Sequence, residues 1–212
     1  YEQVLSRGQP SFTHVLLQAG VGSLAGAMQG YLCSLSGTNR PVTVILEPLQ
    51  ADCLLRSIQA HDGGPRVVPG ALDTIMAGLA CGRPNPIGWE ILRSHADVFA
   101  ACGESMAALG MRILGNPLLD DPRIVSGASG AASTGFLYAV MTRPDLAELR
   151  ERLSLGPSSR LLVINTEGDT DPINYRNVVW NGAFHCDPEE STHAAAAAGR
   201  PVAAAGRYLQ MN

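Results

Sequence analysis

The chain has 212 residues, 46% of them hydrophobic and 16% charged, so it is long and apolar enough to form a packed core. With 15 basic and 19 acidic residues its formal net charge is −4, and it has no basic run, which argues against a nucleic-acid-binding protein that relies on phosphate contacts. It also has no uninterrupted apolar run of about 18 residues, so we expect no membrane span.

Along the chain, apolar runs typical of strands alternate with segments of helical periodicity. We predict strands over residues 13–18, 41–46, 97–101 and 160–165. We predict helices over residues 24–34, 51–60, 74–80, 89–94, 104–114, 144–153 and 173–181, and one more that leaves the turn 126–130 and ends at Met141. Strands separated by helices imply βαβ units and a mainly parallel sheet. Ligands bind at the carboxyl ends of the strands in such sheets, so we expect four loops, those after Gln18, Glu47, Ala101 and Asn165, to share one crevice.

The first predicted strand leads into a glycine-rich turn, GVGSLAG at residues 20–26, which opens a helix. Glycines let the backbone approach a ligand closely, and the free N–H groups and dipole of a helix N-terminus attract an anion. The turn therefore predicts a site for a phosphorylated cofactor or nucleotide. It also fits a relaxed dinucleotide-binding pattern, with Glu47 at the end of the next strand as the ribose ligand, or a tight turn without any ligand.

Two further segments carry polar groups. Residues 127–130 (GASG) approach the G-x-S-x-G nucleophile elbow, but Ala131 replaces the last glycine and the later histidines, His185 and His193, lie beside the C-terminal tail, so we favour a helix N-cap for Ser129. Residues 166–171 (TEGDTD) place three carboxylates and two hydroxyls after a strand, which fits a cation site, a capping loop or a solvated turn.

The basic residues and cysteines limit the chemistry. All 15 basic residues are arginine, so no side chain of this sequence can form a lysine Schiff base. The five cysteines are widely spaced with no C-x-x-C, which indicates free thiols in a cytoplasmic protein, and the five histidines form no zinc-binding pattern, so we predict no metal site.

Seven segments in chain order resemble one family. They are residues 18–22 (QAGVG), 47–53 (EPLQADC), 74–82 (TIMAGLACG), 89–92 (WEIL), 108–112 (ALGMR), 126–127 (SG) and 166–171 (TEGDTD). This series resembles diaminopropionate ammonia-lyase, a pyridoxal-phosphate (PLP) enzyme of fold type II. The resemblance implies an α/β fold with a mainly parallel twisted sheet flanked by helices, the large domain of such an enzyme in incomplete form. We assign residues 1–182 to this domain and residues 183–212 to an alanine-rich tail that we expect to be weakly ordered.

The resemblance also implies a reaction and a cofactor site. Members of the family convert the amino acid 2,3-diaminopropionate to pyruvate and ammonia by PLP-dependent α,β-elimination. The cofactor phosphate would be held mainly by backbone N–H groups of Gly20, Val21, Gly22, Ser23 and Leu24. The hydroxyl of Thr166 would face the pyridine nitrogen, where a hydroxyl, unlike a carboxylate, does not enforce protonation of the ring.

This sequence departs from the family at several positions. The Schiff-base lysine and the acidic general bases of the family lie upstream of the phosphate loop, so the resemblance implies a C-terminal portion without catalytic residues, inactive alone. Arg83 and Ala128 each stand where the family has a glutamate. Cys53 replaces a hard oxygen ligand in a cation site, aligned with Glu47 and Ala51, of the related serine racemases.

Three hypotheses follow from these observations. The first is a truncated diaminopropionate ammonia-lyase, the second a non-catalytic homologue that binds PLP or another phosphate ligand, and the third a Rossmann-like NAD(P)-binding protein. We expect a homo-oligomer, because the missing part of a type II enzyme leaves apolar surface exposed.

Overall fold

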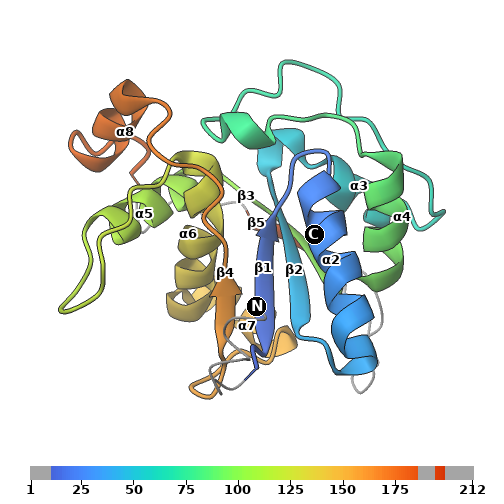
Figure 1. The fold of residues 1–212 in the computed structure, drawn as a ribbon. Coiled ribbons are helices and arrows are strands. Elements are labelled where there is room, and N and C mark those ends of the chain that lie inside the picture. The colour runs from blue at the N-terminus through green and yellow to red at the C-terminus, as the bar shows by residue number, and fades with distance from the viewer. Residues whose placement is uncertain (1–10, 186–193, 199–212) are drawn as a thin grey trace.

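The structure, a computed structural model, describes residues 11–185 and 194–198. Its centre is a five-stranded sheet with the strand order β4-β1-β2-β3-β5 (Figure 1). The strands are β1 (His14–Gln18), β2 (Val42–Pro48), β3 (Val98–Cys102), β4 (Leu161–Val163) and β5 (Ala194–Ala198). The first four are parallel to one another, whereas β5 pairs with β3 in the antiparallel direction.

The order of the strands reverses once. The chain passes from β1 to β2 to β3 in one direction and then returns to place β4 on the other side of β1. His14 at the start of β1 consequently pairs with Val42 of β2 on one side and Leu161 of β4 on the other. In open parallel sheets a crevice forms at such a reversal, at the carboxyl ends of the two strands. The fold therefore favours a site above β1 and β4.

Helices cover both faces of the sheet (Figure 1). On one face lie α2 (Ser23–Ser36), α3 (Cys53–Gln59) and α4 (Pro86–His95), and on the other lie α5 (Glu104–Gly115), α6 (Ala128–Thr142) and α7 (Ala147–Arg152). Helix α8 (Pro172–Val179) packs on α5. Four short 3-10 helices, Gly37–Asn39, Leu49–Ala51, Ala77–Leu79 and Pro144–Leu146, complete the described elements.

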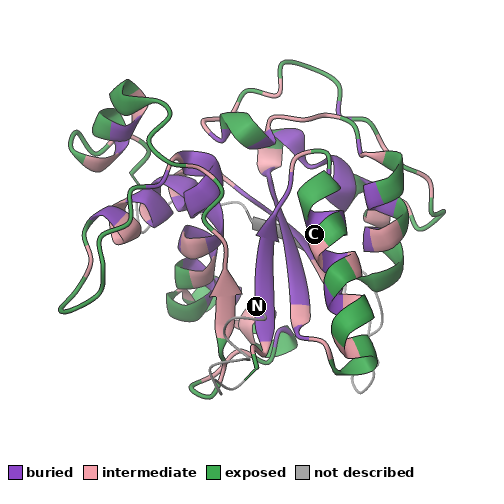
Figure 2. Ribbon diagram, viewed as in Figure 1, coloured by how far each residue is buried: buried purple, intermediate pink, exposed green. Residues whose placement is uncertain are grey.

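The side chains of the strands divide the core into two clusters. Leu16 of β1 and Val44 of β2 pack with α5 and α6, whereas Val15, Leu17 and Ile45 point to the opposite face and pack with α2 and α4. This alternation follows from the two-residue repeat of a strand. All five residues of β1 are buried, which explains why a continuous apolar run, and not an alternating one, marks the central strand (Figure 2).

The predicted fold class is confirmed, and each of the four predicted strands is present. The helix predicted over residues 74–80 is wrong, since only the 3-10 turn Ala77–Leu79 forms there. The backbone leaves the helical region on both sides of this turn, at Met76 with ψ of 60° and at Ala80 with ψ of 67°, so the helix cannot extend in either direction.

The predicted tail, residues 183–212, falls largely outside the described residues, although its segment Ala194–Ala198 forms β5. Among the residues that the structure describes, no helix combines the length and the apolar character needed to cross a bilayer.

Candidate ligand-binding site

A pocket of about 520 Å³ opens at the carboxyl ends of β1 and β4, where the strand order reverses. Its lining comes from residues 18–25 at the end of β1 and the start of α2, from Gly78, Leu79 and Cys81 in and after the 3-10 turn Ala77–Leu79, from Ser129 in α6, and from Thr166, Glu167, Gly168 and Thr170 after β4. All six residues predicted to bind the cofactor, Gly20, Val21, Gly22, Ser23, Leu24 and Thr166, are in this lining. The structure thus brings together two segments that are far apart in the sequence.

The glycine-rich turn leaves the first turn of α2 open toward the pocket. Gly22 is the N-cap of α2, with φ of +85°, and no side chain caps the helix. The first backbone bond of the helix runs from the N–H of Gly26 to the carbonyl of Gly22, at 2.8 Å. The N–H groups of the preceding helical residues have no acceptor within the helix, and phosphate oxygens would satisfy them.

Close backbone packing requires glycine in this turn. A Cβ at Gly20 would lie 3.0 Å from Sγ of Cys81 and 3.3 Å from Cα of Leu79. The turn is also tied to the start of α4, because the N–H of Asn85 donates to the carbonyl of Val21 at 2.7 Å. The conformation of the glycine-rich turn is therefore fixed by its neighbours without a ligand.

Gln18, the last residue of β1, reaches across to the segment after β4. Its Nε2 donates to the carbonyl of Ile164 and to Oγ1 of Thr166, both at 2.7 Å. Its Oε1 accepts the hydroxyl of Ser133 in α6 at 3.0 Å. Gln18 is 3% exposed, so this amide is a buried bridge that fixes the Thr166 hydroxyl at the pocket wall.

Glu167 fastens the same segment to the start of α6. Its Oε2 accepts the N–H of Ser129 at 2.9 Å, and its Oε1 accepts the Thr170 hydroxyl at 3.2 Å. A Cβ at Gly127 would lie 2.4 Å from Oε2 of Glu167, so a side chain there would displace the carboxylate. Among the lining residues of this pocket Glu167 carries the one charged side chain, so an anionic ligand would depend on backbone N–H groups for its stabilisation.

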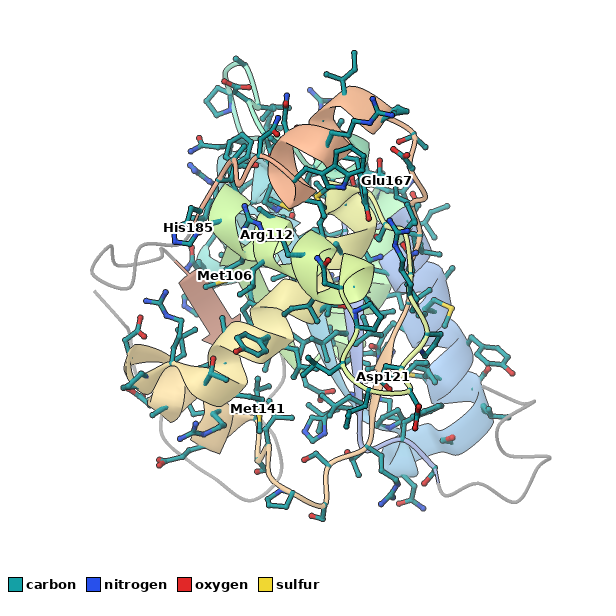
Figure 3. The ribbon with its side chains drawn as sticks, turned by 90° about the vertical axis from the view of Figure 1, so that its left-hand side faces the viewer. Met106, Arg112, Asp121, Met141, Glu167 and His185 are labelled. Atoms are coloured by element: carbon teal, nitrogen blue, oxygen red, sulfur yellow. The ribbon has the colours of Figure 1, made fainter. Side chains whose placement is uncertain are left out.

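The nucleophile elbow is not supported, and neither is our interpretation of Ser129 as an N-cap. Gly127 is the N-cap of α6, and the Ser129 hydroxyl instead accepts the N–H of Gly78 at 3.1 Å. His185 lies well apart from Glu167, the neighbour of Ser129 (Figure 3). A serine nucleophile here would lack its base among the described residues.

Glu47 does not line the pocket. It is fully buried, and its two carboxylate oxygens accept the N–H groups of Leu54 and Leu55 at 2.9 and 2.8 Å, so it caps α3. Burial raises the pKa of Glu47 to about 8. These bonds occupy the group that a ribose or a cation would need, and no cluster of three metal-ligating side chains occurs among the described residues.

The expected four-loop crevice is correct for two loops and wrong for two. The loops after Gln18 and Asn165 line the pocket, but those after Glu47 and Ala101 do not. The physical reason is the strand order, because β2 and β3 lie on the far side of β1 from β4. Gln18, Gly78, Cys81 and Ser129 were not predicted as site residues, although the family-like segments 18–22 and 74–82 contain the first three of them.

Comparison with known proteins agrees with this geometry. The chain is 54% identical over 176 residues to a diaminopropionate ammonia-lyase of Escherichia coli K12, a match that covers 83% of this chain and 44% of the relative. A solved structure of the E. coli enzyme with an aminoacrylate–PLP azomethine reaction intermediate matches with a TM-score of 0.78 and 50% identity, over 87% of this chain and 46% of that one. A second, in complex with D-serine, matches with a TM-score of 0.77 and 49% identity, over 86% and 45%.

These matches confirm the predicted fold type II architecture, since the neighbours are PLP enzymes of that type. No family model matches the chain. The chain spans less than half the length of the curated relatives it matches.

Proposed function

The chain is homologous to the diaminopropionate ammonia-lyases, and from that relationship we propose that it forms the part of such an enzyme that binds the phosphate and ring nitrogen of PLP. The observation that carries the proposal is the pocket at β1 and β4. There the open N-terminus of α2 and the hydroxyl of Thr166 line one cavity. A phosphorylated pyridine fits this donor set, because one end needs several N–H donors and the other a single hydrogen-bond partner.

In this proposal each group of residues has a separate task. Residues 20–24 hold the phosphate through backbone N–H groups, and the dipole of α2 adds to the attraction. Thr166 meets the ring nitrogen and so fixes the orientation of the ring. When bound, PLP withdraws electrons from the α-carbon of an amino acid, which allows a substituent on the β-carbon to leave. The proposed substrate is 2,3-diaminopropionate, with pyruvate and ammonia as products.

These 212 residues offer neither a covalent anchor for PLP nor a free base to remove the α-proton. The sequence has no lysine, and Glu167, the one carboxylate in the pocket lining, is engaged with Ser129 and Thr170. We therefore expect this chain by itself to bind PLP without turning substrate over. The same absence favours the second candidate, a non-catalytic PLP-binding homologue. The buried Glu47 removes the main support for an NAD(P)-binding protein.

Two further expectations belong to the proposal. A homo-oligomer is supported by exposed apolar side chains in the segment after α5 and at the two ends of α8. Leu118, Leu119, Ile173 and Trp180 are 77%, 101%, 76% and 68% exposed. A cytoplasmic location is supported by the free thiols of Cys33, Cys53, Cys81 and Cys102, whereas a role in amino-acid breakdown is proposed from the homology.

The test is a titration of the purified chain with PLP, in which binding is followed by the fluorescence of PLP. PLP should bind, and pyridoxal, which lacks the phosphate, should bind at least about tenfold more weakly because it leaves the N–H groups of α2 unsatisfied. Gly22→Ala should weaken PLP binding, since φ at this position is +85°. Gly37→Ala is the matched control outside the lining, because φ there is also positive, at +53°, and an added Cβ meets nothing within 4 Å.

Two results would contradict the proposal. Equal affinities for PLP and pyridoxal would exclude the phosphate cup. Pyruvate formation from 2,3-diaminopropionate by this chain alone would show that it does not lack the groups needed for catalysis.

A further inference from the structure

The buried amide of Gln18 has an orientation that its neighbours determine. The carbonyl of Ile164 can only accept a hydrogen bond, and it lies 2.7 Å from one terminal atom of Gln18. That atom must be the nitrogen, because an amide oxygen there would face another oxygen. The remaining terminal atom is then the oxygen, and the Ser133 hydroxyl must donate to it at 3.0 Å.

This orientation sets the polarity of the Thr166 hydroxyl. Nε2 of Gln18 has two protons, one directed to Ile164 and the other to Oγ1 of Thr166, at 2.7 Å. Thr166 is therefore an acceptor toward Gln18, and its own proton stays available. Because it has no other side-chain hydrogen bond among the described residues, Thr166 can give that proton to a ligand in the pocket.

The register of the sheet explains why a glutamine stands at this point. The ladder between β1 and β4 ends at the pair Leu16 and Val163, two residues before the end of β1. Beyond it the segment after β4 diverges to line the pocket, and the Gln18 side chain takes up the Ile164 carbonyl that the ladder leaves. Ser133 is fully buried and Gln18 nearly so, which shields the bond between them from water, whereas Thr166 at the other end of the chain of bonds is exposed toward the pocket.

We propose that Gln18 is a positioning residue that makes Thr166 a hydrogen-bond donor to the pyridine nitrogen of PLP, so that the ring stays unprotonated; this rests on the function proposed above. A pyridine nitrogen that accepts a hydrogen bond from the Thr166 hydroxyl uses its lone pair for that bond, and the proton stays on the hydroxyl oxygen. An unprotonated ring withdraws fewer electrons than a pyridinium. Gln18 thereby controls the protonation state of the ring in favour of loss of a β-substituent, although it does not touch the reacting atoms.

The test reads the protonation state of the ring directly. PLP labelled with nitrogen-15 in the ring is bound to the chain, and its nitrogen resonance is followed from neutral to mildly alkaline pH. The wild-type chain should give the signal of an unprotonated pyridine throughout. Gln18→Glu replaces the donor by an acceptor, so the Thr166 hydroxyl turns toward residue 18 and the resonance should move toward that of a pyridinium.

Ser133→Ala is the matched control, because it removes a bond from the same buried chain while Ile164 still orients the amide. This variant should keep the wild-type resonance. Should Gln18→Glu not fold, an analogue of PLP methylated on the ring nitrogen gives the answer with the wild-type chain. Its affinity should be at least about tenfold below that of PLP, because the Thr166 donor loses its acceptor, and Thr166→Val should reduce this difference.

The outcomes separate the two proposals. A wild-type chain that binds no PLP would refute the proposed function and this assignment with it. PLP that binds with a pyridinium signal in the wild type, or with an unchanged unprotonated signal in a folded Gln18→Glu, would refute the assignment and leave the proposed function standing. For the methylated analogue, an affinity equal to that of PLP, or a loss equally large in Thr166→Val, would likewise overturn the donor role.

Discussion

Gly26 of α2 lies at the contact between the glycine-rich turn (residues 20–26) and α4, and its replacement tests whether this contact supports the pocket. A Cβ at Gly26 would lie 2.8 Å from Cα of Gly88 and 3.2 Å from its carbonyl oxygen. Carbon atoms prefer separations of about 3.5–4.0 Å, so α4 would have to move away from α2 by about 0.7 Å. Gly88 in turn touches the turn itself, since a Cβ there would lie 2.6 Å from the Gly22 carbonyl oxygen.

Gly30, one helical turn further along α2, offers a matched control. A Cβ at Gly30 would meet only the side chain of Ile91, at 3.8 Å. Both substitutions to alanine gain about 0.5–1 kcal/mol of helix propensity. Gly30→Ala should therefore be neutral or stabilising. Gly26→Ala adds about 1–3 kcal/mol of overpacking, so the free energies of unfolding of the two variants should differ by about 2 kcal/mol.

Urea unfolding followed by circular dichroism and by tryptophan fluorescence measures this difference, since Trp89 of α4 is 1% exposed in the native chain. The same displacement moves the N–H groups of the turn, so PLP affinity should fall in Gly26→Ala and stay unchanged in Gly30→Ala. A Gly26→Ala chain as stable as Gly30→Ala would show that α4 yields freely and that the close contact does not support the pocket.

Three other expectations concern packing, pH and thiol reactivity. Gly135→Ala should cost about 3 kcal/mol or more in urea unfolding, because its Cβ would lie 1.8 Å from the Met106 carbonyl oxygen between α6 and α5, whereas Gly156→Ala, with open space, should change stability by less than about 0.5 kcal/mol. Because burial raises the pKa of Glu47 from 4.5 in the unfolded chain to about 8, the folded state binds this proton more tightly; the contribution of Glu47 to stability is complete below about pH 4.5 and is lost as the pH rises through about 8, and Glu47→Gln should flatten the urea midpoint over that range. PLP should slow the alkylation of Cys81, which lines the pocket, but not that of Cys33, which is similarly exposed and lies outside the lining. Mass spectrometry of peptides cleaved after arginine measures both rates. Equal protection of the two cysteines would show that PLP binds elsewhere.

The sequence predicted those parts of the pocket that depend on neighbouring residues or on a family pattern. The run Val15, Leu16, Leu17 predicts a buried strand, and glycines directly after it predict a phosphate turn whatever the rest of the fold does. Thr166 was predicted from the resemblance of its segment to a family, and the parallel pairing of β1 and β4 brings it to the same pocket. The strand and the turn could be predicted from residues close in the sequence, and Thr166 from the pattern of the family.

Glu47 and Gln18 show what the sequence left undetermined. An acidic residue at the end of a strand can point to a ligand or cap the next helix, and the choice depends on the 3-10 turn Leu49–Ala51 that brings the start of α3 back over Glu47. A polar residue at the end of a buried strand has no characteristic pattern at all. The position of Gln18 is meaningful only once β4 is known to pair with β1 and to end its ladder early.

The early end of β4 links the shape of the sheet to the chemistry proposed for the site. Had β4 remained paired with β1 as far as Gln18, its next backbone carbonyl would have joined the ladder and Thr166 would have followed a regular strand. Instead the segment leaves the sheet after Val163, and its polar groups find partners in Gln18 and at the N-terminus of α6. The positive end of the α6 dipole favours a carboxylate there, which accounts for Glu167. The divergence that opens the pocket therefore also leaves the Ile164 carbonyl without a partner in the sheet. This carbonyl orients the Gln18 amide, which in turn orients the hydroxyl of Thr166.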